Sequence, residues 1–309
     1  EALGNRDVAV PVDNALIDDR QGDRGVTPVP EPANASGGSV PAEQVAGRPP
    51  PVQADAVFHL HVPDNVARLF DLVKAPNPQS VDMLNTSQLA MKDYWWNPLV
   101  SAQPKHDPRL HSRMHHSVGF MRVADAWFNY LANHHGAPAL PGSADGAKDA
   151  WRRCLLQAAL LHDVGHSPFS HLLEEVFNEL HWSLDGRSRF HHEDLTHFRS
   201  LALLKEFDTA HSGTAISSAA EDYDRLSRLL DGATGIHWLD AITNGPFDAD
   251  KIDYVFRDQR WLGMGGRQGD CLVWFGEFLA GQEVSPQGHI FLHGTSASAA
   301  YRILAERCH

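Results

Sequence analysis

Apolar residues recur with the period of an α-helix over much of the chain, and this pattern limits its fold more than any other feature. Between Met114 and Leu131 they fall at positions 114, 118, 121, 124, 127, 128 and 131, on one face of a long helix. The segment from Trp151 to Leu161 is apolar on nearly every side, which predicts a buried helix. The chain is therefore expected to fold into a mainly α-helical domain.

Further helices are predicted at 62–72, 168–180, 195–207, 223–230, 252–256 and 301–309, where the pattern is again helical. Residues 288–293 favour a strand instead, which we expect to be one arm of a small hairpin near the C-terminus. The predicted fold class is all-α, a helical bundle with one small β-hairpin.

Residues 1–55 differ in composition from the rest of the chain. They contain eight prolines and six glycines but no lysine. We interpret them as a Pro/Gly-rich arm or linker, with a strap laid over a partner subunit as the functional alternative. Residues 56–309 are predicted to form the folded domain. Because the chain begins with Glu1 and its last predicted helix ends without a cap, we expect both termini to be trimmed.

The charge of the chain argues against several classes of partner. It has 39 acidic and 26 basic residues, a net charge of −13, and no basic run, so we do not expect nucleic acid to bind. No apolar run approaches the roughly 18 residues of a membrane span. Three cysteines are too few and too scattered for a disulfide framework, which fits a reducing, cytoplasmic location.

Histidines are concentrated in the middle of the chain, where 14 of the 20 fall between positions 106 and 211. The sharpest motif is the pair His162 and Asp163 at the end of the apolar helix. Burying both without partners would be costly, and a divalent ion offsets that cost. Adjacent helix residues diverge by about 100 degrees, so both reach one ion only near a helix end, which Gly165 and Pro168 supply. The alternative is a surface helix terminus with a polar cap.

The residues around this pair form an ordered set of motifs: RMHHSVG from Arg113, HDVGHSPFSH from His162, HE at His192 and DADKIDYVFRD from Asp248. The set resembles the HD superfamily of metal-dependent phosphohydrolases. Within it, the set is similar to the deoxynucleoside triphosphate triphosphohydrolases, the group of the bacterial dGTPases and the SAM-and-HD-domain protein. The resemblance spans residues 57 to 307 and implies an HD-domain helical bundle. The implied reaction is hydrolysis of a dNTP at the α-phosphorus to a deoxynucleoside and triphosphate.

The resemblance also implies one divalent metal ion, held by His116, His162, Asp163 and Asp250. Mixed nitrogen and oxygen donors suit manganese, iron, nickel or zinc, and magnesium is compatible. His115 is the alternative to His116, although the spacing from Arg113 favours His116. A ligating imidazole needs its other ring nitrogen held, and we expect Glu193 or Asp194 to supply that carboxylate.

Other residues are assigned by the resemblance to the substrate and to proton transfer. The implied substrate contacts are Arg113, Lys251, Tyr254, Asp258, Gln88 and Leu89. The residues implied in acid–base and transition-state roles are His166, His171, His192 and Glu193. Arginine offers forked donors and lysine a point charge, which suit a polyphosphate, and an imidazole can move protons at neutral pH. For each histidine of this set, a satisfied position in the core is the alternative.

Two features depart from the family. The glutamine-arginine-leucine signature expected near residues 78–90 is absent, and the chain stops soon after Arg307. We therefore expect the C-terminal lobe to be truncated or absent, and regulation by nucleotides is not inferred. The expected partners are a dNTP substrate and further copies of the chain, and a different protein would bind through the N-terminal arm. Two other functions stay open: an HD nucleotidase or phosphodiesterase acting on another nucleotide, and a nucleotide-binding regulatory subunit of a partner enzyme.

Overall fold

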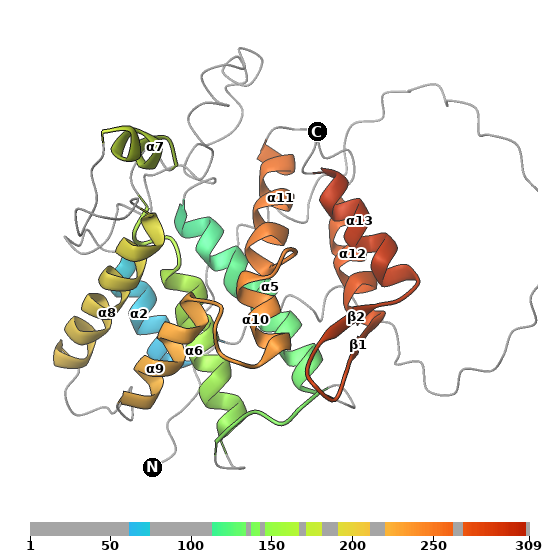
Figure 1. Ribbon diagram of the computed structural model, residues 1–309, viewed down its shortest axis with the longest axis horizontal. Helices are drawn as coiled ribbons and strands as arrows, with labels where there is room; N and C mark the ends of the chain where they lie inside the picture. The colour runs from blue at the N-terminus through green and yellow to red at the C-terminus, as the bar shows by residue number, and fades with distance from the viewer. Residues whose placement is uncertain are drawn as a thin grey trace, which may run out of the picture.

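The computed structural model describes residues 62–74, 113–133, 137–142, 146–166, 171–180, 191–210, 220–261 and 268–306. In these ranges the regular structure is helical apart from two short strands, which form a hairpin near the C-terminus (Figure 1). The predicted all-α bundle with a small hairpin is confirmed. The predicted arm at 1–55 and the implied sugar contacts Gln88 and Leu89 lie outside the described residues.

Helices α5 (Arg113–Ala132) and α6 (Ala147–Leu161) pack against each other at the centre of the fold (Figure 1). Both match the helices predicted from the apolar spacing. Residues 154–161 of α6 are all buried, as a helix that is apolar on every side requires. Full burial of one large apolar side chain contributes about 1.5–3 kcal/mol, so this pair of helices supplies much of the core.

Helix α6 is buried because α2 (Asp64–Lys74) and α9 (Ala220–Leu230) pack on it. Helix α8 (His192–Ala210) packs on both of these helices. Helix α7 (His171–Glu179) meets the start of α8, where His192 contacts Glu174. The helices predicted at 62–72, 168–180, 195–207 and 223–230 are confirmed within a few residues of these bounds.

Helix α11 (Ala249–Trp261) packs on α5, and α10 (His237–Asn244) contacts α5, α9 and α11. The spacing predicted α11 only over 252–256 and gave no sign of α10. As a result, the start of α11 lies near the start of α5 and the end of α6. These three helix ends position the site described below.

The C-terminal part is a helix pair, α12 (Gln268–Ala280) and α13 (Thr295–Glu306), joined by the hairpin. Strand β1 (Gln282–Val284) runs antiparallel to β2 (Ile290–Leu292), which confirms the strand predicted at 288–293. The indole Nε1 of Trp127 donates a hydrogen bond of 2.8 Å to Gln282 Oε1 and so ties the hairpin to α5. Within the described ranges, we find no helix with the length and apolarity needed to cross a membrane.

Candidate metal centre

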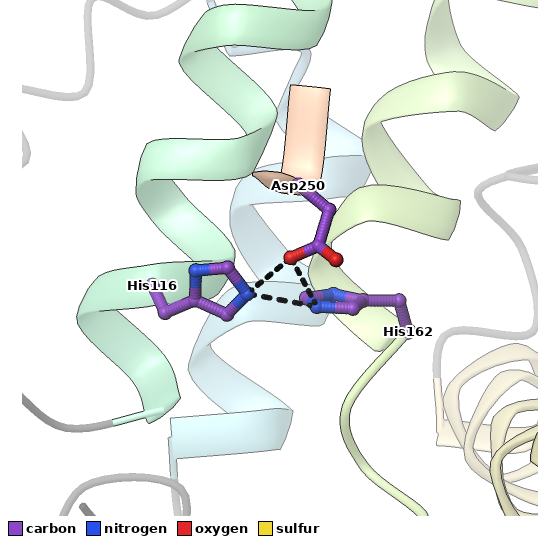
Figure 2. A group of neighbouring side chains, drawn as sticks. All are labelled: His116, His162 and Asp250. Atoms are coloured by element: carbon purple, nitrogen blue, oxygen red, sulfur yellow. Dashed lines mark hydrogen bonds and ion pairs between the residues drawn. The ribbon is translucent and has the colours of Figure 1, made fainter. Parts of the chain in front are cut away.

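Three side chains converge where the first turn of α5, the end of α6 and the first turn of α11 meet (Figure 2). His116 Nε2 lies 2.8 Å from Asp250 Oδ1 and 3.1 Å from His162 Nε2, and His162 Nε2 lies 3.8 Å from Asp250 Oδ1. An ion with bonds of about 2.1 Å has neighbouring ligand atoms about 3.0 Å apart in an octahedron and about 3.4 Å apart in a tetrahedron. The three separations bracket these values, so the group could hold one divalent ion.

Hydrogen bonds fix both imidazoles in the orientation that a metal ion needs. His116 Nδ1 lies 2.8 Å from Asp253 Oδ2, and His162 Nδ1 lies 2.8 Å from the carbonyl oxygen of Ala159. Because a carbonyl or an ionised carboxylate can only accept, both Nδ1 atoms carry a hydrogen. When the rings are neutral, two Nε2 lone pairs therefore face each other at 3.1 Å, an arrangement that a cation between them stabilises.

Asp163 lies beside this group and is bound to Arg113. Arg113 Nη1 donates to Asp163 Oδ2 over 2.7 Å, and both side chains are buried, 1% and 5% exposed. The same carboxylate lies 3.3 Å from His162 Nε2 through Oδ1 and 3.9 Å from His116 Nε2 through Oδ2. Arg113 thus neutralises and orients a buried carboxylate next to the imidazoles, whereas the resemblance had assigned it to the substrate.

The charged side chains of this group shift one another's pKa values toward the ionised forms. Burial alone would lower the pKa of His116, but hydrogen bonds to Asp250 and Asp253 outweigh it and raise that pKa to about 10. Burial opposes ionisation of Asp250, yet its hydrogen bond to His116 lowers its pKa. Burial also opposes ionisation of Asp163, but the charges of His162 and Arg113 hold its pKa well below its usual range. A metal ion at this position would therefore displace the proton of His116.

Close packing of α5 on α11 explains why a glycine follows His116 in the RMHHSVG motif. A Cβ atom at Gly119 would lie 1.7 Å from Asp253 Oδ1 and 2.2 Å from Arg257 Nη2. Arg257 in turn holds Asp253 with two hydrogen bonds of 3.0 and 2.9 Å. Only glycine at this position lets the Asp253 carboxylate reach His116.

A second close approach places the histidines that follow His162. Helix α6 ends at Leu161, as predicted, and 162–166 leave it in a turn. Gly165 donates its backbone N–H to Thr196 Oγ1 of α8 at 3.2 Å, and a Cβ there would lie 2.1 Å from Thr196 N. His166 is thereby brought to the start of α8, where its ring stacks on His192 at 3.6 Å between centroids.

His166 is buried, and its Nε2 lies 3.3 Å from Asp163 Oδ1. Its Nδ1 has no hydrogen-bond partner within the part of the chain that the structure describes. Burial lowers the pKa of His166 to about 2, although the charge of Asp163 opposes that shift. The ring is therefore neutral, and it can orient a ligand but carries no proton to donate as an imidazolium.

Glu174 of α7 is a site residue that the sequence reasoning missed. Its Oε2 lies 2.9 Å from His192 Nδ1 and 3.4 Å from His171 Nδ1, and its Oε1 lies 3.3 Å from His191 Nδ1. Burial opposes its ionisation, but the hydrogen bond from His192 outweighs it and lowers the pKa of Glu174. The signal was present as a glutamate three residues after His171, one helical turn away.

The prediction that Glu193 or Asp194 holds a ligating imidazole is wrong for His116. The carboxylate that holds His116 is Asp253, rather than Glu193 or Asp194. Glu193 is 69% exposed and lies 3.3 Å from His192 Nδ1, away from the metal group. Asp253 could have been found, because it follows Asp250 by three residues and so shares a face of the same helix.

The remaining implied substrate contacts lie on α11. Lys251 Nζ binds the carboxylate of Asp248 and donates to the carbonyl oxygen of Gly245 at 3.1 Å. Tyr254 and Asp258 are half-buried and follow Asp250 by one and two helical turns, so the three residues share one face. Lys251, Tyr254 and Asp258 therefore lie on the same helix as Asp250. The ammonium of Lys251 is bound to the carboxylate of Asp248.

Comparison with known proteins gives a partial match, and no protein-family model matches the chain. The chain is 26% identical over 211 residues to the "Deoxynucleoside triphosphate triphosphohydrolase SAMHD1 homolog" of Dictyostelium discoideum, covering 66% of this chain and 35% of that protein. It is 28% identical over 160 residues to the uncharacterized protein YwfO of Bacillus subtilis, covering 50% of this chain and 30% of that protein. The chain thus spans about a third of the length of these curated relatives.

Two solved structures share its fold. A phosphohydrolase from Bacteroides thetaiotaomicron superposes with a TM-score of 0.54 at 19% identity, covering 83% of this chain and 52% of that one. A hypothetical protein from Aquifex aeolicus superposes with a TM-score of 0.51 at 21% identity, covering 80% of this chain and 54% of that one. The chain therefore shares the fold of these two solved structures, one of which is described as a phosphohydrolase.

Proposed function

We propose that the chain is a metal-dependent phosphohydrolase that converts deoxynucleoside triphosphates into a deoxynucleoside and triphosphate. The observation that carries this proposal is the convergence of two imidazole Nε2 atoms and a carboxylate on one point, with both Nδ1 atoms held by acceptors. The choice of a dNTP rests on the ordered motifs and on the name of the Dictyostelium relative.

In this proposal His116, His162 and Asp250 hold one divalent ion, with Asp163 as the fourth ligand. The donor set suits manganese, iron, nickel or zinc, and also magnesium. When bound, such an ion polarises phosphoryl oxygens and lowers the pKa of bound water. Arg113 keeps Asp163 ionised and aimed at the imidazoles, and Asp253 accepts from His116 Nδ1 and so leaves His116 Nε2 to face the ion.

We assign the histidines outside the proposed metal ligands to proton donation and to orientation of the phosphate or water. When water attacks the α-phosphorus, its oxygen forms a bond to phosphorus and the bond to the 5′-oxygen breaks, so the leaving oxygen needs a proton. His192 and His171 are the proposed donors, because Glu174 accepts from both Nδ1 atoms and so orients both rings. Glu193 contacts His192 and assists it. The neutral ring of His166 orients the phosphate or the water.

Substrate binding is proposed for one face of α11. Tyr254 and Asp258 would contact the triphosphate and the sugar 3′-hydroxyl, respectively. Lys251 would hold a phosphate, for which its ammonium must leave the carboxylate of Asp248. Gln88 and Leu89 are proposed to contact the sugar.

A second candidate is an HD nucleotidase or phosphodiesterase. The observation that favours it is that Arg113 and Lys251 are both engaged with carboxylates, those of Asp163 and Asp248. A monophosphate or a phosphodiester needs fewer basic contacts than a triphosphate. A homo-oligomer, with residues 1–55 as a docking segment for a partner, stays a prediction that sedimentation of the purified chain would test.

Separation of the reaction products tests these proposals. The purified chain is incubated with Mn²⁺ and each dNTP, and we expect deoxynucleoside and tripolyphosphate in equal amounts. Asp250→Asn should abolish turnover, whereas Asp224→Asn should not, because Asp224 is exposed and pairs with Arg228 on α9. Pyrophosphate or orthophosphate as the first product would contradict cleavage of the bond between the α-phosphorus and the 5′-oxygen. Binding of dNTP without turnover, unchanged in His162→Ala, would favour a regulatory subunit.

A further inference from the structure

A second group of potential metal ligands surrounds Glu174, at the junction of α7 and the start of α8. Single ligand atoms of His171, Glu174 and His192 all lie within 4.8 Å of one another. The rings of His171 and His192 meet edge to face at 5.0 Å between centroids. Each of them points its Nδ1 at the same carboxylate oxygen, Oε2 of Glu174.

These contacts have the lengths of the edges of a coordination polyhedron. Glu174 Oε2 lies 2.9 Å from one imidazole nitrogen and 3.4 Å from the other. Neighbouring ligand atoms around an ion with bonds of about 2.1 Å are about 3.0 to 3.4 Å apart. Two imidazoles and one glutamate form a donor set that binds zinc in known catalytic sites, where water takes the fourth position.

We propose that His171, Glu174 and His192 form a second divalent cation site, suited to zinc and neighbouring transition metals. It shares no ligand with the group of His116, His162 and Asp250. This proposal does not depend on the proposed reaction, because it concerns binding of a metal ion alone. An ion on the two Nδ1 atoms would replace the hydrogens that Glu174 accepts, and it would therefore compete with proton donation by His171 and His192.

The three proposed ligands of this second site differ in their exposure to solvent. Glu174 and His192 are 15% and 14% exposed, and His171 is 66% exposed. An ion would therefore rest on Glu174 and His192 and reach solvent past His171, with room for water as a further ligand. We expect it to bind more weakly than an ion at the buried group around His116, because the exposed imidazole loses side-chain freedom on binding.

His166 connects the two groups. Its Nε2 lies 3.3 Å from Asp163 Oδ1 at the first group, and its ring stacks on His192 of the second at 3.6 Å. A cation bound at Glu174 would thus be connected to the first group through the stacked rings of His192 and His166.

Glu174 also joins a neighbouring group with His191 and Glu193, which competes for the same ion. His191 and Glu193 are 57% and 69% exposed, so holding them in place costs more side-chain entropy. We therefore assign the ion to His171 and His192. Without metal, each Nδ1 donates its hydrogen to Glu174, so each ring must carry that hydrogen on Nε2 before its Nδ1 can bind an ion.

Metal stoichiometry tests the proposal directly. The full chain is stripped with a chelator, dialysed against dilute Zn²⁺ and analysed for bound zinc by mass spectrometry of the element. We expect two zinc ions per chain for the wild type and one for Glu174→Gln, since a neutral amide is a poor zinc ligand. Glu175→Gln is the matched control on the same helix, and because Glu175 is exposed it should retain two ions.

Further variants assign each ion to its group. His162→Ala should retain one ion, and Glu193→Gln should retain two. His171→Ala should lose one ion without loss of folding, because its ring lies at the surface. One zinc per wild-type chain, or two in His171→Ala or Glu174→Gln, would overturn the proposal. Loss of an ion in Glu193→Gln would also overturn it, by moving the site to the neighbouring group.

Discussion

Replacement of Gly119 by alanine tests how the packing of α5 on α11 builds the candidate metal centre. The new Cβ would lie 1.7 Å from Asp253 Oδ1 and 2.4 Å from its Cγ, well inside ordinary contact distance. In the middle of a helix, alanine is more favourable than glycine by roughly 0.5–1 kcal/mol. Overpacking of a buried site costs about 1–3 kcal/mol, so the substitution should lower the free energy of unfolding by about 1–2 kcal/mol.

The clash should also weaken metal binding, because Asp253 would have to leave His116 Nδ1. Loss of such a hydrogen bond to a metal ligand typically lowers metal affinity by roughly 10–100-fold. Urea denaturation in the presence of a chelator measures the first effect, and titration with Mn²⁺ or Zn²⁺ measures the second.

A double-mutant cycle supplies the decisive comparison. In an Asp253→Ala background the contacts with Oδ1 and Cγ are gone, and Arg257 Nη2, 2.2 Å from the new Cβ, loses the carboxylate that holds it. Gly119→Ala should then be neutral or should stabilise the chain by up to about 1 kcal/mol. Equal destabilisation in both backgrounds would refute the reasoning, because the clash would then not involve Asp253.

Three further predictions follow from the same contacts. Asp253→Asn should lower the affinity for Zn²⁺ by roughly 10–100-fold in a titration, and an unchanged affinity would show that this carboxylate does not orient His116. Arg113→Met leaves the charge of Asp163 buried without its partner, which should reduce the free energy of unfolding in urea by about 3–5 kcal/mol; a loss below 1 kcal/mol would contradict this role. Burial would lower the pKa of His116, but Asp250 and Asp253 raise it to about 10. The protonated ring therefore stabilises the folded state fully below about pH 6.5, and this contribution is lost as the pH rises toward 10. Urea denaturation of the metal-free chain between pH 6.5 and 8.5 should therefore show falling stability, by at most about 1.4 kcal/mol per pH unit, and a flat profile would argue against it.

The parts of the fold that the sequence predicted are those with strong helical periodicity. Helices α5 and α6 were predictable because their apolar residues follow one face or cover all faces over several turns. Helix α10 has only eight residues, and its N-cap Ile236 offers no side-chain hydrogen bond to mark the start. In α12 the run from Leu272 to Phe275 is continuously apolar, so periodicity cannot separate a helix from a strand.

The site was predictable where its chemistry is local in sequence, and not where it depends on packing. His162 and Asp163 stand out because they end a buried helix. The contact between His116 and Asp253 joins residues 137 positions apart, and only the packing of α11 on α5 brings them together. The engagement of Arg113 with Asp163 likewise depends on packing, here of α5 against α6, because a motif gives the residue type but not whether it will face a carboxylate of the chain or a phosphate.

The proposed function requires that the group of His116, His162 and Asp250 supports attack of water on the α-phosphorus of a dNTP. Hydrolysis in ¹⁸O-labelled water with Mn²⁺, followed by mass analysis of the products, tests this most directly. We expect one ¹⁸O atom in tripolyphosphate, none in the deoxynucleoside, and no turnover by Asp250→Asn. Label in orthophosphate or pyrophosphate, or undiminished turnover by Asp250→Asn, would contradict it.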